Sequence, residues 1–211
     1  MAKPSWLTIT PASGSGNGQI QYSATEHTGR VARPSSPYKS IVENSKTADC
    51  TVSVTQNPKA EFVQIQSTAS PAKTGGTLKI TGTGNAATLT FSYKDSPAPT
   101  LELSPVTTYT VNSASATSGT AISGDPGATA QYTFEVTLEV PENTTLESKT
   151  CTLVVQGSAS SITSQCVITQ SAGDPYLWVG EADQTEILVT IPQAGTAQSV
   201  QVLSNDAWTV S

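Results

Sequence analysis

Short apolar stretches that alternate with polar residues recur about every ten residues along the chain, with turn-forming clusters between them. A period of two is the pattern of a strand with one buried face, and regularly spaced strands of this kind are typical of a β-sandwich. No window shows the period of a helix. Strands are expected at Trp6–Thr10, Gln19–Ser23, Thr51–Gln56, Phe62–Gln66, Thr77–Thr81, Thr88–Tyr93, Thr100–Ser104, Thr107–Val111, Ala130–Val140, Thr150–Gln156, Gln165–Gln170, Leu177–Val179, Glu186–Ile191, Ser199–Leu203 and Ala207–Val210.

The composition agrees with an all-β fold. Charged residues make up 12% of the chain, about half the usual share of roughly 25%. Ser, Thr, Val, Ala, 15 Gly and 13 Pro take their place. Thr and Val suit a pleated, half-buried surface, whereas Gly and Pro favour turns.

Three short repeats relate different parts of the chain. The related pairs are WLTITP (Trp6–Pro11) with TLELSP (Thr100–Pro105), SVTQ (Ser53–Gln56) with VITQ (Val167–Gln170), and TLTFS (Thr88–Ser92) with AWTVS (Ala207–Ser211). Residues 58–171 contain all of these elements in one order. Residues 1–57 contain only the later elements and residues 172–211 only the earlier ones, as in a repeated module.

These repeats predict two immunoglobulin-like β-sandwiches. Residues 58–171 form a continuous sandwich, residues 172–211 form the first half of a second, split sandwich, and residues 1–57 form its second half. A half-sandwich exposes an unpaired edge and apolar surface, which costs about 25 cal/mol per Å². The two halves are therefore expected to complete each other.

Completion has two possible geometries. Both links, Gln56–Phe62 and Gln170–Leu177, are short, and a partner fragment within the same chain has a high effective concentration. We therefore expect two sandwiches that lie side by side and close within one chain. If the sandwiches stack end to end instead, the halves join successive molecules, as in donor-strand complementation.

The two halves together resemble the BACON family of immunoglobulin-like modules. The resemblance lies in the Ser-Asn-x-x-Trp element at Ser204–Trp208, in Trp6, in the turn at Pro11–Gly14 and in the strand end Val54–Gln56. An Arg that commonly follows the second strand in this family corresponds to Arg30 or Arg33. The central module is BACON-like, with Thr100 in place of the Trp and about twenty additional residues before VITQ.

The resemblance implies either a secreted carbohydrate-active protein of gut Bacteroidetes or a protein of the phages that infect them. Met1–Trp6 contains no apolar stretch of a signal peptide and leads directly into a strand. No attached enzyme domain is recognised. We therefore expect an auxiliary (decoration) capsid or other virion protein, made in the host cytoplasm, that binds other virion proteins. A module that binds carbohydrate, such as mucin glycans, is the alternative.

Charge and hydropathy exclude some partners. The formal net charge is −6, so nucleic acid and anionic membranes are not expected as partners. No segment approaches the roughly 20 apolar residues of a transmembrane helix.

No catalytic residue, cofactor site or metal site is predicted, and the protein is not expected to be an enzyme. The single histidine, His27, lies in an expected loop (Ala24–Gly29) without a G-x-S-x-G motif, and is interpreted as a surface residue. Glu181, Asp183 and Glu186 cluster in a turn without EF-hand spacing, so calcium is only an alternative to a solvated face. GSGNG (Gly14–Gly18) and GTGN (Gly82–Asn85) precede no helix and are interpreted as hairpin turns. The sequon at Asn143 is expected by chance.

Three cysteines do not suggest a disulfide framework. Cys151 and Cys166 flank an expected turn at Gly157–Ser160, so a cross-strand disulfide is possible, but small buried residues are the favoured interpretation. Cys50 has no neighbour of this kind.

Aromatic residues are the other candidates for carbohydrate binding. By alternation, Trp6 and Trp208 are expected in the core of the split module, and Trp178 fits either the core or the surface. The tyrosines are scattered along the chain without a recognisable platform, at Tyr22, Tyr38, Tyr93, Tyr109, Tyr132 and Tyr176.

Overall fold

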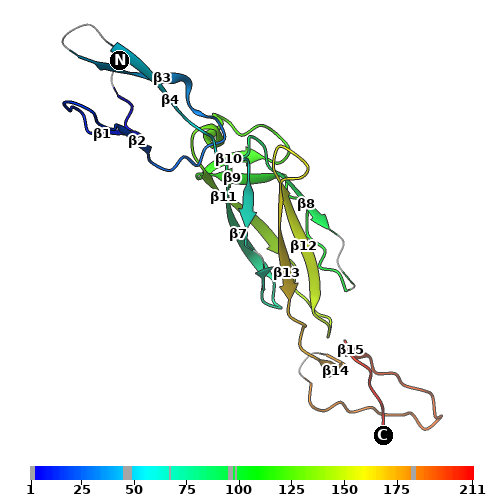
Figure 1. The fold of residues 1–211 in the computed structure, drawn as a ribbon. Coiled ribbons are helices and arrows are strands. Elements are labelled where there is room, and N and C mark those ends of the chain that lie inside the picture. The colour runs from blue at the N-terminus through cyan, green and yellow to red at the C-terminus, as the bar shows by residue number, and fades with distance from the viewer. Residues whose placement is uncertain (1–2, 45–48, 67, 95–96, 98, 182–183) are drawn as a thin grey trace.

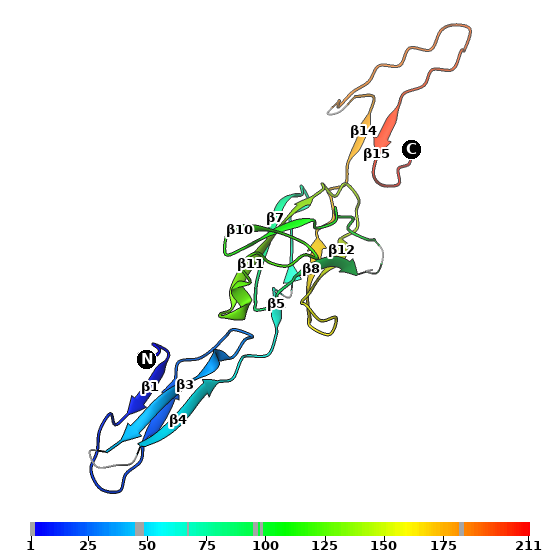
Figure 2. The same ribbon diagram turned by 90° about the horizontal axis from the view of Figure 1, so that it is seen from above.

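The protein is a rod built from β-strands. The computed structural model describes residues 3–44, 49–66, 68–94, 97, 99–181 and 184–211. The all-β prediction is confirmed, because the only helical element in this part of the chain is a short 3-10 turn, Pro126–Ala128. The N-terminal hairpins, the central sandwich and the C-terminal hairpin follow one another along the rod, and the two termini lie at opposite ends (Figures 1 and 2).

Fifteen strands are described. The N-terminal part contains β1 (Leu7–Thr10), β2 (Gln21–Ala24), β3 (Arg33–Glu43) and β4 (Asp49–Gln56). The central part contains β5 (Val63–Ile65), β6 (Thr68–Ala69), β7 (Gly76–Gly84), β8 (Thr90–Lys94), β9 (Thr108–Val111), β10 (Ala114–Thr117), β11 (Tyr132–Val140), β12 (Lys149–Gln156) and β13 (Thr163–Gln170). The C-terminal part contains β14 (Leu177–Val179) and β15 (Val202–Ser204).

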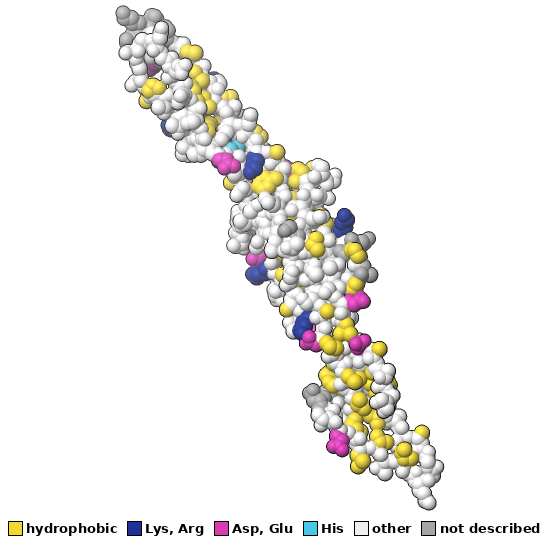
Figure 3. All heavy atoms as spheres, turned by 60° about the horizontal axis from the view of Figure 1, so that its bottom comes forward, with side chains coloured by type: hydrophobic (Ala, Val, Ile, Leu, Met, Phe, Trp, Pro, Cys, Tyr) yellow, Lys and Arg dark blue, Asp and Glu magenta, His cyan; other side chains and the backbone are white. Residues whose placement is uncertain are grey.

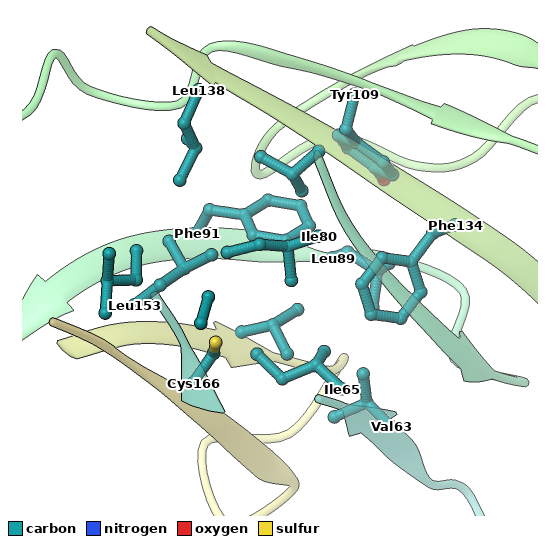
Figure 4. Packing of buried hydrophobic residues seen from close by; sticks show 14 of the residues in the cluster. Val63, Ile65, Ile80, Leu89, Phe91, Tyr109, Phe134, Leu138, Leu153 and Cys166 are labelled. Carbon is teal, nitrogen blue, oxygen red and sulfur yellow. The ribbon is translucent and has the colours of Figure 1, made fainter. Parts of the chain in front are cut away.

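The central part is a two-layer sandwich. One sheet has the order β10-β9-β11-β7-β5 and the other the order β6-β13-β12-β8. Alternate residues of β11 and β12 point between the layers, as the burial patterns BeBiBeBeB and iiBiBiBi show. Phe91, Phe134 and Leu153 meet there in one core, in which the Phe91 and Phe134 rings are 6.0 Å apart between centroids (Figure 4).

The parts at the two ends are hairpins rather than closed sandwiches. β1 pairs with β2, β3 pairs with β4, and β14 pairs with β15, each as a two-stranded sheet. The described residues 3–56 therefore form two separate hairpins, and β14 and β15 form the C-terminal hairpin.

The structure corrects several expected strands. Thr100–Ser104 makes only a single parallel bridge, from Thr100 to Thr150. Glu186–Ile191 and Ala207–Val210 form no strand. The long strand β3 was missed because Pro34 and Pro37 cannot donate to a ladder, and Pro within an apolar run argues against a strand. The register of β3 against β4 shifts in this segment, between Arg33 and Tyr38.

Closure of the split module within one chain is a wrong expectation. Residues near Trp6 and residues near Trp208 lie at opposite ends of the rod (Figures 1 and 2). The reason is the way the modules are joined, which stacks them end to end rather than side by side.

The GTGN segment is also not a hairpin turn, because Gly82 and Gly84 lie within β7. A Cβ atom on Gly82 would overlap the ring of Phe134 and the carbonyl oxygen of Gln64. Glycine is thus required there by close packing against the core ring.

The junction between the N-terminal hairpins and the sandwich is organised by Asn85, whose side chain is fully buried. Its Oδ1 accepts a hydrogen bond from the amide of Phe62 (2.9 Å), and its Nδ2 donates to the carbonyls of Thr28 and Ala60 (3.2 Å each). The amide of Lys59 also donates to the carbonyl of Gly29 (2.9 Å). A loop of the first module, the linker and the next module are thereby tied together.

The junction between the sandwich and the C-terminal hairpin has the same construction, with Asn205 in the place of Asn85. Oδ1 of Asn205 accepts from the amide of Tyr176 (2.9 Å), and Nδ2 donates to the carbonyls of Thr144 and Asp174 (2.9 Å each). The amide of Gly173 donates to the carbonyl of Thr145 (2.7 Å). The chain therefore repeats one module-to-module joint along the rod.

We predict that Asn85→Ala leaves the amide of Phe62 and the carbonyls of Thr28 and Ala60 without this partner. Leaving buried polar groups unsatisfied costs about 1–3 kcal/mol. Urea unfolding is expected to show that loss, and small-angle X-ray scattering is expected to show a more bent rod. Asn57→Ala, at an exposed linker position, is the control and should change neither. A straight rod of unchanged stability in Asn85→Ala would contradict the role assigned to this side chain.

Candidate functional site

The candidate site consists of the apolar sheet faces at the two ends of the rod. The structure allows each end residue to be matched with a counterpart in the central sandwich. Figure 3 shows hydrophobic side chains gathered on the surface of both end parts. Patches of this kind mark interaction surfaces in soluble proteins.

The β14–β15 hairpin repeats the β5–β7 pair in register. Leu177 pairs with Ser204 and Val179 with Val202, as Val63 pairs with Gly84 and Ile65 with Gly82. Each β14 residue is thus 114 positions after its β5 counterpart, and each β15 residue is 120 positions after its β7 counterpart. The C-terminal part is built like the first strands of the central sandwich.

Positions that form the core of the central sandwich are uncovered at the C-terminal end. Val63 and Phe91 are 8% and 7% exposed, whereas their counterparts Leu177 and Val210 are 55% and 86% exposed. We call the surface formed by these counterparts the C-end face. Its members are Leu177, Val179, Val200, Trp208 and Val210.

The N-terminal hairpins repeat the later strands of the sandwich. β3 pairs with β4 through Arg33 and Gln56, as β12 pairs with β13 through Lys149 and Gln170. β2 is the counterpart of the end of β11, because Gln56 Nε2 donates to the Thr25 carbonyl (2.7 Å) as Gln170 Nε2 donates to the Pro141 carbonyl (2.7 Å).

The inner side of these hairpins is also only partly covered. Val54 is half-buried where its counterpart Ile168 is fully buried, and Val42 is 38% exposed where Val155 is fully buried. We call this surface the N-end face. Its members are Ile9, Tyr22, Val42, Val52, Val54 and Gln56.

The expected core positions of two tryptophans need correction. Leu7, not Trp6, is the buried residue of β1, and Trp6 is half-buried, because the inward positions of this strand are Leu7 and Ile9. Trp208 is 51% exposed. It lies at the position that fully buried Leu89 occupies in the central sandwich.

One aromatic pair was missed in the sequence. The rings of Tyr176 and Trp178 lie 4.8 Å apart between centroids with an interplanar angle of 30°. Trp178 lies in β14, and Tyr176 directly precedes this strand, two residues before Trp178. Both side chains therefore lie on the side of the strand opposite Leu177 and Val179. The signal in the sequence is the i, i+2 spacing, which brings two rings onto one side of a strand.

The histidine is not a surface residue. His27 is buried at the N-terminal junction, with Nε2 2.6 Å from the Val31 carbonyl. Its buried Nδ1 has no hydrogen-bond partner among the described residues. Nearby Arg30 forms an ion pair with Asp125 of the central sandwich. The loop that contains His27 is buried because it packs in the module-to-module joint. The sequence pattern does not show this burial, because it depends on contacts with the next module.

The described residues bring together no group of three or more His, Cys, Asp or Glu side chains that could hold a metal ion. Glu181 and Glu186 are exposed, and Asp183 lies outside the described residues. Asn143 is buried and donates to the carbonyls of Glu147 and Ser171 (2.9 Å each), so its sequon is not presented to solvent.

Two shallow pockets lie on the central sandwich. One, of about 200 Å³, is lined by Tyr93, Leu103, Val106 and Leu138 together with Ser and Thr residues and Glu139. The other, of about 210 Å³, is lined by residues that include Val111, Ile122 and Pro126. No helix among the described residues could cross a bilayer.

Comparison with known proteins adds no relative. No family model matches the chain, and no curated protein matches it. The resemblance to BACON modules therefore remains a prediction from the residues.

The cysteines are free, and Cys151 and Cys166 are not directly opposite each other. Cys166 pairs with Leu153, and Cys151 pairs with Ile168. Burial, and to a smaller extent Cys166, raises the pKa of Cys151 to about 11, and burial also raises the pKa of Cys166. Both thiols therefore remain protonated at neutral pH.

We predict that a thiol reagent modifies only the exposed Cys50 of the native protein at pH 8, because the thiolate is the reactive form. Absorbance with a chromogenic disulfide should report one thiol, rising to three in denaturant. Cys50→Ser should then report none in the native state. Rapid modification of Cys151 or Cys166 would contradict the burial described above.

Proposed function

We propose that this chain is a non-enzymatic structural protein, an auxiliary (decoration) capsid or other virion protein of a phage that infects Bacteroides. It binds other virion proteins through the ends and loops of its rod. The single observation that carries the proposal is the pair of uncovered apolar sheet faces at the two ends. The assignment to a phage rests in addition on the resemblance of the split module to the BACON family.

The joints support a structural role. Both are made of amide hydrogen bonds between consecutive modules, part-buried at Asn85 and more exposed at Asn205. Glycines let the chains approach closely there, because a Cβ atom on Gly29 would overlap Thr129 and one on Gly173 would overlap the Asn143 carbonyl. A rod with such joints holds its two ends at a defined separation, as a particle component requires.

We predict that an antibody raised against the chain labels intact particles of the corresponding phage, and that peptides of the chain occur in gradient-purified virions. At low ionic strength, the immobilised chain should retain capsid or tail proteins from disrupted particles. Immobilised Val210→Asp, which places a charge on the C-end face, should retain less. Absence of the chain from purified particles, together with no retention, would reject the virion assignment.

Carbohydrate binding is the second candidate, and the Tyr176–Trp178 pair favours it. Tyr176 is 37% exposed and Trp178 is half-buried. Two neighbouring rings offer a surface for the apolar face of a sugar ring, as aromatic side chains do in binding sites generally. The pair lies at the C-terminal joint, where the amide of Tyr176 is fixed by Asn205.

We predict that, if this pair binds sugar, the chain is retained on immobilised mucin and on a glycan array. Trp178→Ala should abolish the retention, because stacking would lose one of its two rings. Tyr38→Ala, on the N-terminal hairpins, is the matched control and should bind normally. Equal retention of both variants would exclude the pair as a sugar platform.

A further inference from the structure

We propose that the C-end face of one copy of this chain completes the N-end face of the next copy, so that the two form a composite β-sandwich and the copies join head to tail. The inference rests on the proposed function only in treating the end faces as binding surfaces. It specifies the partner, a second copy, and the register of the contact.

The two faces are complementary parts of one module. The C-terminal part contains counterparts of β5 and β7 in their own register, and the N-terminal hairpins contain counterparts of the end of β11 and of β12 and β13. In the central sandwich β7 pairs with β11, and β8, whose first residues correspond to the segment Thr209–Ser211, pairs with β12.

The central pairs predict the residues that meet. Glu139 pairs with Thr77 and Val155 with Phe91 in the sandwich. Their counterparts place Ser23 of one copy opposite Ala197 of the other, and Val42 opposite Val210. Val42 and Val210 are both exposed in the free chain, at 38% and 86%. Pairing would cover apolar surface on both sides of the contact.

A polar group gives independent support. Gln170 is fully buried, and its Nε2 lies within hydrogen-bond distance of the carbonyls of Ala72 and Lys73, at the start of the sandwich, as well as of Pro141. Gln56 occupies the same position on β4 and donates to Thr25, the counterpart of Pro141. Pro192 and Gln193 of a second copy are the counterparts of Ala72 and Lys73, because the amide of Gly195 donates to the Pro192 carbonyl (2.8 Å) as the amide of Gly75 donates to the Ala72 carbonyl (3.0 Å). Their carbonyls would give the side-chain amide of Gln56 the same hydrogen-bond acceptors that Gln170 has in the central sandwich.

The charges of the two end parts are of opposite sign. Residues 1–57 contain five Lys and Arg against three Asp and Glu. Residues 172–211 contain five Asp and Glu and no Lys or Arg. Opposite charge favours the encounter of an N-terminal end with a C-terminal end over the encounter of two like ends. Association is therefore expected to weaken as salt is added.

The joints explain why the partner is expected to be another copy. The same hydrogen-bonded joint lies on both sides of the central sandwich, and it holds the two end faces at opposite poles of the rod (Figures 1 and 2). One molecule cannot bring them together. In an assembly, central and composite sandwiches would alternate along one line, each connected to the next by this joint.

Sedimentation velocity of the full 211-residue chain is the first experiment. Its mass is expected to rise with concentration from 21.8 kDa and to fall as salt is raised. Val210→Asp and Val42→Asp should each weaken association at least about 100-fold, because each buries a charge in the contact. Thr209→Asp is the matched control, since its counterpart Thr90 is exposed on the outer side of the strand. It should associate as the natural chain does.

A mixture of the two defective variants tests polarity. Val210→Asp keeps a working N-end face, and Val42→Asp keeps a working C-end face. Each alone should stay at the mass of one chain, and the mixture should stop at twice that mass. Longer assemblies in the mixture would overturn the head-to-tail arrangement.

Cross-linking tests the register. In a Cys50→Ser background, Ser23→Cys with Ala197→Cys should form disulfide-linked ladders under mild oxidation. Ser23→Cys with Gln198→Cys, shifted by one residue onto the other side of the strand, should form far fewer. Equal cross-linking of both pairs would refute the register.

A chain that remains a monomer at every concentration and salt level would overturn self-assembly. If that monomer still binds virion proteins, the proposed function stands and the end faces belong to another partner. If it assembles but is absent from virions, the inference stands and the virion assignment fails.

Discussion

A β-sandwich is held together because each of its two sheets covers the apolar face of the other. The central part of this chain meets that requirement, with Ile80, Val136, Leu153 and Ile168 fully buried between the layers. The end parts repeat strand pairs of this module, but each contains only one portion of it. Their inward apolar positions are therefore partly uncovered, because each end part lacks the sheet that would cover them.

The module-to-module joints determine where the uncovered apolar faces lie in the molecule. Asn85 and Asn205 each connect an amide of the following module, a carbonyl of the linker and a carbonyl of the preceding module. Because both joints are built alike, the rod is extended by repetition of one geometry. The uncovered faces are held apart at the poles, so their apolar surface is available to other molecules and not to each other.

This arrangement suits a protein whose role is to connect. The only histidine is engaged in a joint, two of the three thiols are buried in the core, and the described pockets are shallow. The chemistry that the structure offers is that of sheet edges, apolar faces and one aromatic pair. We therefore propose that the chain acts through its ends, whether the partner is a virion protein, a glycan or a further copy.

The sequence predicted the all-β class and most strand positions, because alternation and turn residues are local signals. It also determined the order of the repeated elements. It misplaced Trp6, His27 and the segment with Pro34 and Pro37, and it gave no sign that Asn85 and Asn205 form the joints. Whether a side chain in a loop is buried depends on a module that lies far away in the chain. The end-to-end stacking of the modules is seen only in the folded molecule. It depends on hydrogen bonds among a linker, a loop and the following strand, and no periodicity in the sequence records them.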